Sequence, residues 1–316
     1  MGGRKAVRAI LGSLFITASA YGGYKLYHYF QHPQTWYVPT NQVAVYSAYF
    51  ANDSTATVLP PHEPPESALK DCDFYFFTNT MPNIEKEQTA WKIIIKEQAD
   101  ETTQRQYKML PHTVQSLMGY KYTIYMDYDF KWKKSPKDLV NVMGKKDMLV
   151  FRHAFSRCVC EEAISQINRV NGGKASLVEL FKRYSSFPDK LHTKIYPIAH
   201  SGILVRADAT DNPSGHKKTL NRWKHFAEEW YSLFEVASRD ELSLNVVATK
   251  HNIDIHLLER DIYQNEWLEF TNKDKIPSAR PHLWNKGNSG KQDQGHQCNL
   301  QACINTILDT YDSPPV

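Results

Sequence analysis

The chain has 316 residues, of which 41% are hydrophobic and 23% are charged, and its formal net charge is +4. This length and apolar content support a globular fold with a sizeable core. The basic residues are scattered among acidic ones, which argues against nucleic-acid binding. The sequence has no internal repeat, which argues against solenoid and propeller architectures.

The N-terminal segment predicts a membrane anchor. Basic residues in 1–8 precede an uncharged run, so we expect a cytoplasmic tail, a signal anchor over 9–30 and a polar stem over 31–41. The small residues of 18–20 also fit a signal-peptidase site, so a cleaved signal peptide is the alternative. An anchor predicts a single-pass type II protein of the Golgi or ER membrane with its main domain in the lumen, and cleavage predicts a secreted protein.

Five cysteines are compatible with such an oxidising compartment. They are Cys72, Cys158, Cys160, Cys298 and Cys303. Cys158 and Cys160 are too close in sequence for an easy mutual disulfide, and no second Cys or His pair lies at zinc-finger spacing. We therefore expect one or two structural disulfides and a buried thiol.

Strands and helices alternate along the chain after the stem. Runs rich in β-branched and aromatic residues predict strands over 42–50, 72–78, 91–96, 122–126, 147–152 and 200–206. Helical spacing occurs in 102–118, with a break or a new first turn at Pro111, and in 161–170, 176–185 and 220–234. Trp223 and Trp230 lie seven apart on the last helix and are expected in the core.

This alternation predicts an α/β sandwich whose mixed, mostly parallel sheet is flanked by helices. The predicted domain covers 42–272, and a C-terminal tail covers 273–316.

Two carboxylates follow the strand at 122–126, namely Asp127 and Asp129. Ligands of such sheets bind beyond the carboxyl ends of the strands. Side chains two apart in an extended chain point the same way, so both acids can converge on one cation while Tyr128 turns away. Mn²⁺ or Mg²⁺ held there would be completed by diphosphate oxygens and would neutralise a leaving nucleotide diphosphate, which predicts sugar transfer from a nucleotide sugar. The alternative is that the two acids only solvate a turn.

Other polar groups could complete such a site. Arg105, Lys108 and His112 would share one face of a continuous helix. Arg105 and Lys108 could contact the diphosphate or the base, and the alternative is a solvated helix face.

The later segment 238–245 holds Asp240 and Glu241. Asp240 is the candidate near the anomeric carbon or the acceptor hydroxyl, as a general base if the mechanism inverts and as a stabiliser of positive charge if it retains. Glu241 is its substitute. The alternative for Asp240 is a helix N-cap.

A charged group also follows the fifth predicted strand. It could face the acceptor or donor sugar, or form a structural ion-pair network. It consists of His153, Arg157, Glu161 and Glu162.

Five segments carry a family resemblance in their order along the chain: "CDFYFFTN", "YKMLPH", "YTIYMDYDF", "FRHAFSRCVCEEA" and "SRDELSLNVV". They resemble the glycosyltransferase-like family of plant turgor-regulation and mucilage proteins, also called domain of unknown function 616, over roughly 42–270. More distantly, "HSGILV" followed by "RDELSLN" is similar to glycogenin-like transferases. The resemblance implies a GT-A fold that uses a sugar nucleotide and a divalent metal, with a glycan, glycoprotein or lipid as acceptor.

The resemblance also implies roles for single residues. Asp129 would be the direct metal ligand, and Asp127 would touch the metal or the ribose. A third ligand, often His in GT-A enzymes, would be His282, or His256 in its place. The chain departs from these patterns at His200 and Ser201, where glycogenin-like enzymes have an Asn-containing turn, at Glu241, where Gln is usual, and at Cys160, where the plant family commonly has an aromatic residue.

Two other functions compete with sugar transfer. One is hydrolysis of a lipid amide such as ceramide, an activity attached to the plant family, but the sequence has no Gly-x-Ser-x-Gly motif and no dense His and Asp array across several membrane spans. The other is a catalytically inactive binding relative, against which the presence of Asp127, Asp129 and Asp240 argues.

Overall fold

The computed structural model describes residues 41–309, with gaps in this range. The gaps are 52–57, 83–88, 97–98, 157, 169, 171, 187–197, 208–216, 261, 264 and 273–299. The predicted anchor and nearly all of the stem therefore lie outside the described residues, as do His282 and Arg157. In the part of the chain that is described, none of the helices has both the length and the apolar character that a membrane crossing requires.

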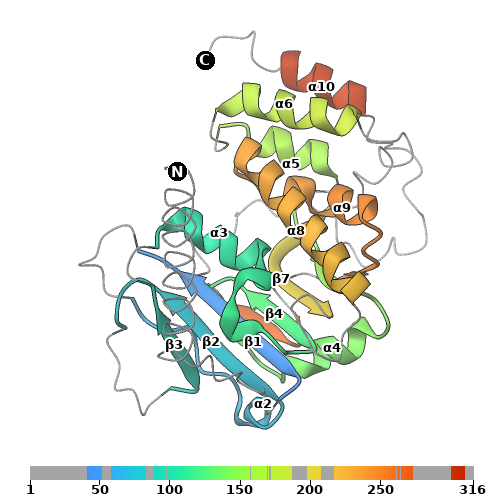
Figure 1. Ribbon diagram of the computed structural model, residues 1–316. Helices are drawn as coiled ribbons and strands as arrows, with labels where there is room; N and C mark the ends of the chain where they lie inside the picture. Colours follow the sequence, from blue (N-terminus) through green and yellow to red (C-terminus); the bar gives the residue numbers. More distant parts are fainter. Residues whose placement is uncertain are drawn as a thin grey trace, which may run out of the picture. The chain divides into compact units, whose positions relative to one another are not determined.

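A seven-stranded sheet in the order β3-β2-β1-β4-β7-β6-β8 forms the centre of the domain (Figure 1). Its strands are β1 (Val43–Tyr49), β2 (Cys72–Thr78), β3 (Trp91–Ile95), β4 (Tyr122–Met126), β6 (Met148–Arg152), β7 (Ala199–Ala207) and β8 (Ile255–Leu258). β7 runs antiparallel to both of its neighbours, β4 and β6, while the other pairings are parallel. The predicted mixed, mostly parallel sheet is confirmed.

Helices cover both faces of this sheet. The described α-helices of the domain are α2 (Glu66–Leu69), α3 (Glu101–Met109), α4 (Lys137–Met143), α5 (Val159–Gln166), α6 (Gly173–Ser185), α8 (Lys217–Ala237), α9 (Glu241–Lys250) and α10 (Leu300–Asp309). Alternate residues of β1 enter two separate cores: Ala44 and Tyr46 lie in one, and Val43 and Val45 in the other. Both faces of the strand are therefore buried, which explains its almost continuous apolar run.

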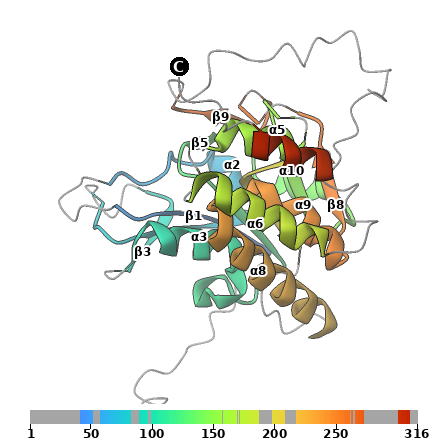
Figure 2. The same ribbon diagram turned by 90° about the horizontal axis from the view of Figure 1, so that it is seen from above.

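The first core contains the larger helices. Met109 of α3 and both Trp223 and Trp230 of α8 belong to it, so the core position predicted for the two tryptophans is confirmed. Residues of α5, α6, α9 and α10 complete this core. Figure 2 shows α10 alongside α5 and α6, although α10 lies in the segment predicted as a tail.

A small second sheet follows the two predicted carboxylates. β5 (Phe130–Trp132) pairs antiparallel with β9 (Leu268–Phe270). Just after β9, Thr271 donates hydrogen bonds from its backbone N–H and its Oγ1 to the carbonyl oxygen of Asp129, at 2.8 and 2.9 Å. The loop after β4 is thereby held by a segment that is distant in the sequence.

The helix α3 ends at Met109, and Pro111 begins a separate 3₁₀ turn over Pro111–Thr113. Proline has no N–H to donate and its ring clashes with the preceding turn, so the predicted break is confirmed. The continuous helix that would have placed His112 on one face with Arg105 and Lys108 does not form, and that grouping of His112 was wrong.

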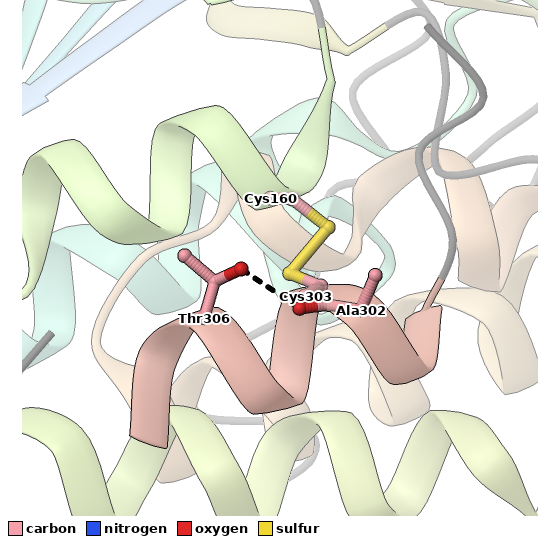
Figure 3. Close-up of a disulfide and its surroundings, with 4 residues drawn as sticks. All are labelled: Cys160, Ala302, Cys303 and Thr306. Atoms are coloured by element: carbon pink, nitrogen blue, oxygen red, sulfur yellow. Dashed lines mark hydrogen bonds between the residues drawn. A yellow bond between two sulfur atoms is a disulfide. The ribbon is translucent and has the colours of Figure 1, made fainter. Parts of the chain in front are cut away.

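Cysteine pairing follows the prediction of a structural disulfide and a buried thiol. Cys160 of α5 is bonded to Cys303 of α10 (Figure 3). Cys72 on β2 is free and buried. The disulfide closes a sequence separation of 143 residues, so it removes much conformational freedom from the unfolded chain.

Candidate active site at the end of β4

The direction of β7 determines what lies at the end of β4. Because β7 is antiparallel, its first residues lie at the edge where β4 and β6 end, and His200 pairs with Phe151. The backbone N–H of Asp127 donates to the carbonyl oxygen of Gly202 at 2.8 Å. The edge therefore brings residues of three strands together beside Asp127.

The segment from Asp127 to Phe130 is a turn and not an extended chain. The N–H of Phe130 donates to the carbonyl oxygen of Asp127 at 3.3 Å. The extended chain from which we expected the two carboxylates to point the same way is therefore not present. Tyr128 turns away as expected, since its ring stacks on Tyr49 and Phe76 with centroids 5.0 and 6.1 Å apart.

Lys108 is the buried cation of this site. Its side chain is 1% exposed, and its Nζ lies 2.5 Å from Asp240 Oδ2 and 3.6 Å from Asp127 Oδ1. It also donates a hydrogen bond to Ser201 Oγ at 2.9 Å. Burying an ammonium group is costly unless it is paired, and these three partners provide that compensation. The alternative of a solvated helix face is wrong for Lys108.

Asp240 is almost entirely buried and fully engaged through one oxygen. Its Oδ2 accepts hydrogen bonds from Lys108 and, at 2.9 Å, from Ser201, and Arg105 Nη1 lies 3.6 Å away. Burial raises the pKa of Asp240, but the positive charges of Lys108 and Arg105 outweigh it and hold the pKa well below its usual range. An anion stabilised in this way is a weak proton acceptor, so the geometry favours the charge-stabilising role over the general base.

The capping alternative for Asp240 was wrong. Asp240 occupies the position just before α9, but its side chain makes no capping hydrogen bond. Its backbone carbonyl instead accepts the indole N–H of Trp230 at 2.9 Å. The backbone of Asp240 is therefore held by Trp230 of the core, and its carboxylate is held by Lys108 and Arg105.

Asp127 keeps part of its surface open, with 32% of the side chain exposed. Loss of surrounding water raises the pKa of its carboxyl group, and the charges of Lys108 and Arg105 act in the opposite direction. Of the predicted third ligands, His256 lies on β8, three places from β4 in the sheet order, and His282 is outside the described residues. In the described part of the chain, no three His, Cys, Asp or Glu side chains are grouped so that they could hold a metal.

The donor set of Asp127 and Asp129 still suits a hard divalent ion. Mg²⁺ is usually bound through one or two carboxylates together with phosphate oxygens of the substrate, so a complete protein cage is not required. Carboxylate oxygens are also ligands that Mn²⁺ prefers. In their chemistry, the two carboxylates match an ion whose remaining ligands come from a bound diphosphate.

His200 on β7 belongs to the site, although the sequence did not predict a role for it. His200 Nδ1 accepts the N–H of Gly202 at 2.9 Å, and His200 Nε2 lies 3.2 Å from the hydroxyl of Tyr263. Its ring stacks on His153 with centroids 5.5 Å apart. Burial, assisted by His153 and Lys108, lowers the pKa of His200 well below its usual value, so the ring is neutral. The "HSG" run at 200–202 was the signal in the sequence, but it does not reveal which residues His200 contacts.

Glu241 and Glu162 both lie close to Arg239, the residue before Asp240. Glu241 is 8% exposed, and its Oε2 makes no hydrogen bond to any described residue, with Arg239 Nη2 3.6 Å away. Glu162 is 1% exposed, forms an ion pair with Arg239, and lies 3.5 Å from His153 Nε2 through its Oε2. For His153 and Glu162, the structure therefore supports the network alternative over direct sugar contact.

Comparison with known proteins finds similarity to solved structures. No family model and no curated protein sequence matches the chain. Among solved structures, the apo form of mouse xyloside xylosyltransferase 1 is 11% identical with a TM-score of 0.34, over 70% of this chain and 85% of that one. The apo structure of the bifunctional glycosyltransferase WbbM is 9% identical with a TM-score of 0.37, over 70% of this chain and 39% of that one.

Proposed function

We propose that the protein transfers a sugar from a nucleotide-diphosphate sugar to a glycan, glycoprotein or lipid acceptor with the help of Mn²⁺ or Mg²⁺. The observation that carries this proposal is the buried contact between Lys108 and Asp240 beside the part-exposed Asp127 at the carboxyl edge of β4. A buried ion pair is an expensive way to stabilise a fold, and strongly perturbed charged groups at a sheet edge are typical of functional sites.

The charge of the site supports a divalent ion. Among the residues that the structure describes, four carboxylates and three cations form this ionic cluster, so a diphosphate bound beside it would meet an excess of negative charge. The carboxylates are Asp127, Asp240, Glu241 and Glu162, and the cations are Arg105, Lys108 and Arg239. An ion held by Asp127 and Asp129 would neutralise the departing diphosphate.

The remaining residues have roles that follow from their contacts. Arg105 is 28% exposed and can reach a phosphate with its guanidinium group, whose planar fork suits phosphate oxygens. Lys108 keeps Asp240 ionised, so that Asp240 can stabilise positive charge that develops at the anomeric carbon. This role favours a retaining mechanism.

The disulfide supports the proposed compartment. Disulfides persist in oxidising environments, and Cys160–Cys303 connects two helices of the folded domain. We therefore keep the ER or Golgi lumen, with a type II anchor or a cleaved signal peptide, as part of the proposal.

Lipid amide hydrolysis finds less support in the geometry. Lys108 Nζ and Ser201 Oγ are 2.9 Å apart, which is the spacing of a nucleophile and its base. However, Ser201 is 0% exposed, and its hydroxyl accepts a hydrogen bond from Lys108 while it donates to Asp240, so Lys108 is not placed to take the proton of Ser201. A catalytically inactive relative would have no need of this costly buried pair.

The test uses the full chain and thermal unfolding. UDP-sugars and GDP-sugars are added one by one, with and without Mn²⁺, and release of the nucleotide is assayed in parallel. A ligand at about 100 times its Kd stabilises the native state by about 2.7 kcal/mol, so one donor should raise the Tm in the presence of Mn²⁺. Asp129→Asn should abolish this rise, and Asp138→Asn on α4 is the control.

Two results would overturn the proposal. One is a panel in which no sugar nucleotide changes the Tm and Asp129→Asn behaves like the wild type. The other is release of sphingosine from ceramide by the purified protein, lost in Ser201→Ala, which would establish the hydrolase instead.

A further inference from the structure

Glu162 on α5 is a buried carboxylate with partners on several sides. It is 1% exposed, and its Oε2 accepts a hydrogen bond from Ser156 Oγ at 2.6 Å. Its Oε1 accepts one from Arg239 Nη2 at 2.9 Å, and His153 Nε2 lies 3.5 Å from Oε2. A buried carboxylate is tolerated only when its oxygens are satisfied, so these contacts restrict the position of Glu162 and of its partners.

One branch of this network reaches the start of α9, where Asp240 and Glu241 lie. Arg239 directly precedes Asp240 in the chain, and its Nη2 is also 3.6 Å from Glu241 Oε2. Bonding to Glu162 therefore fixes the guanidinium near Glu241 and restrains the residue that precedes Asp240. The position of Asp240 relative to Lys108 depends on this segment of backbone.

The other branch reaches the strand edge that carries Asp127. His153 Nδ1 accepts the N–H of Ser156 at 3.0 Å, so the ring hydrogen is on Nε2, which faces Glu162. The His153 ring stacks on His200, and His200 Nδ1 accepts the N–H of Gly202. The carbonyl of Gly202 in turn accepts the N–H of Asp127.

We propose that Glu162 is a positioning residue whose single carboxylate sets the Asp240 side and the Asp127 side of the site relative to each other. It reaches Asp240 through Arg239 and reaches Asp127 through His153 and His200. Outer partners of this kind orient the groups that contact a ligand. The sequence offered Glu162 only as one member of a charged group.

The helix turn that holds Glu162 is itself anchored. Cys160 lies two residues before Glu162 on α5 and is bonded to Cys303 of α10 (Figure 3). α10 also packs on α6. The turn of α5 that holds Glu162 is therefore joined covalently to α10, which is itself packed on α6. A residue that positions two sides of a site needs such rigid support.

The structural test does not depend on any activity. The indole N–H of Trp230 donates to the carbonyl of Asp240, so its NMR signal reports on the Asp240 side. The imidazole nitrogens of His200 report on the Asp127 side. In Glu162→Gln, both signals should shift in the full chain labelled with ¹⁵N-tryptophan and ¹⁵N-histidine. Glu162→Asp, which keeps the charge, should restore part of the wild-type spectrum.

The control is Glu179→Gln on α6. Glu179 is 51% exposed and pairs with Arg183, so the same loss of charge there should leave both signals in place. A folded Glu162→Gln protein with an unchanged Trp230 signal overturns the inference. If Glu162→Gln does not fold, the Trp230 and His200 signals are measured in Glu162→Asp and Ser156→Ala instead. Loss of the fold in all three variants would mean that Glu162 is only a structural residue.

The kinetic arm rests on the proposed function. With the donor identified by thermal unfolding, Glu162→Gln should lower kcat about tenfold or more with little change in KM for the donor. A loss of stability in Glu162→Gln without the fall in kcat would contradict the positioning role. A wild-type protein that shows no transfer defeats the proposed function but leaves the NMR result to decide the role of Glu162.

Discussion

Lys108 of α3 and Asp240 at the start of α9 meet with Nζ and Oδ2 2.5 Å apart, and their side chains are only 1% and 4% exposed. Removing Lys108 leaves the buried carboxylate of Asp240 without its closest counter-ion. Lys108→Met should therefore lower the free energy of unfolding by about 3–5 kcal/mol, measured by urea denaturation. The double variant with Asp240→Leu should recover much of this loss because neither charge remains.

The control for this prediction is Lys146→Met. Lys146 pairs with Asp254 at the surface, with side chains 45% and 58% exposed. Exposed pairs contribute about 0–1 kcal/mol, so the effect should be small. Equal losses for the two lysines would show that Lys108 does not carry a buried pair.

Gly202 is required by the close packing of β7 against Asp127. A Cβ at this position would lie 2.8 Å from His200 Cε1 and 3.1 Å from Asp127 Oδ2. Gly202→Ala should cost about 1–3 kcal/mol by overpacking and should weaken the Mn²⁺-dependent rise in Tm with the donor. Gly144→Ala meets no atom within 4 Å and is strained only by its φ of +64°, so it should destabilise without affecting donor binding.

The neutral state of His200 predicts a pH dependence of stability. Its pKa in the fold is depressed, so below about pH 6.5 the unfolded chain binds a proton that the folded chain does not. Stability should therefore fall with decreasing pH by up to about 1.4 kcal/mol per pH unit from this group, until the pH reaches the folded pKa.

His200→Asn keeps an acceptor for the Gly202 N–H and should flatten the curve of Tm against pH between about 6.5 and 5. The exposed His62→Asn variant is the comparison and should keep the wild-type slope. An unchanged slope in His200→Asn would mean that another group is responsible.

The disulfide between α5 and α10 should contribute directly to stability. Cys303→Ser removes it and should lower the free energy of unfolding by about 2–5 kcal/mol, as seen by denaturant unfolding under non-reducing conditions. Cys72→Ala changes a thiol that is buried but free, so its effect should be smaller. A loss for Cys303→Ser no greater than that for Cys72→Ala would contradict this role.

The sequence alone determined the regular elements that depend on local pattern. β2 and β4 were predicted to the residue, because a strand buried on both faces needs an uninterrupted run of β-branched and aromatic residues. The break at Pro111 followed in the same way from the missing N–H of proline. The residue types of a site, including Asp127, Lys108 and Asp240, were also visible as local clusters.

The tertiary structure decided which of these groups meet. The pairing of β5 with β9 joins segments that are far apart in the chain, and no local pattern encodes it. The antiparallel direction of β7 places Ser201 and His200 beside Asp127, and the packing of α3 and α9 on the sheet places Lys108 against Asp240. Periodicity reports which side chains are buried, whereas contacts between distant segments depend on the path of the whole chain. For this reason, the sequence could name Asp127, Lys108 and Asp240 as candidates, but only the fold shows that they form one ionic cluster.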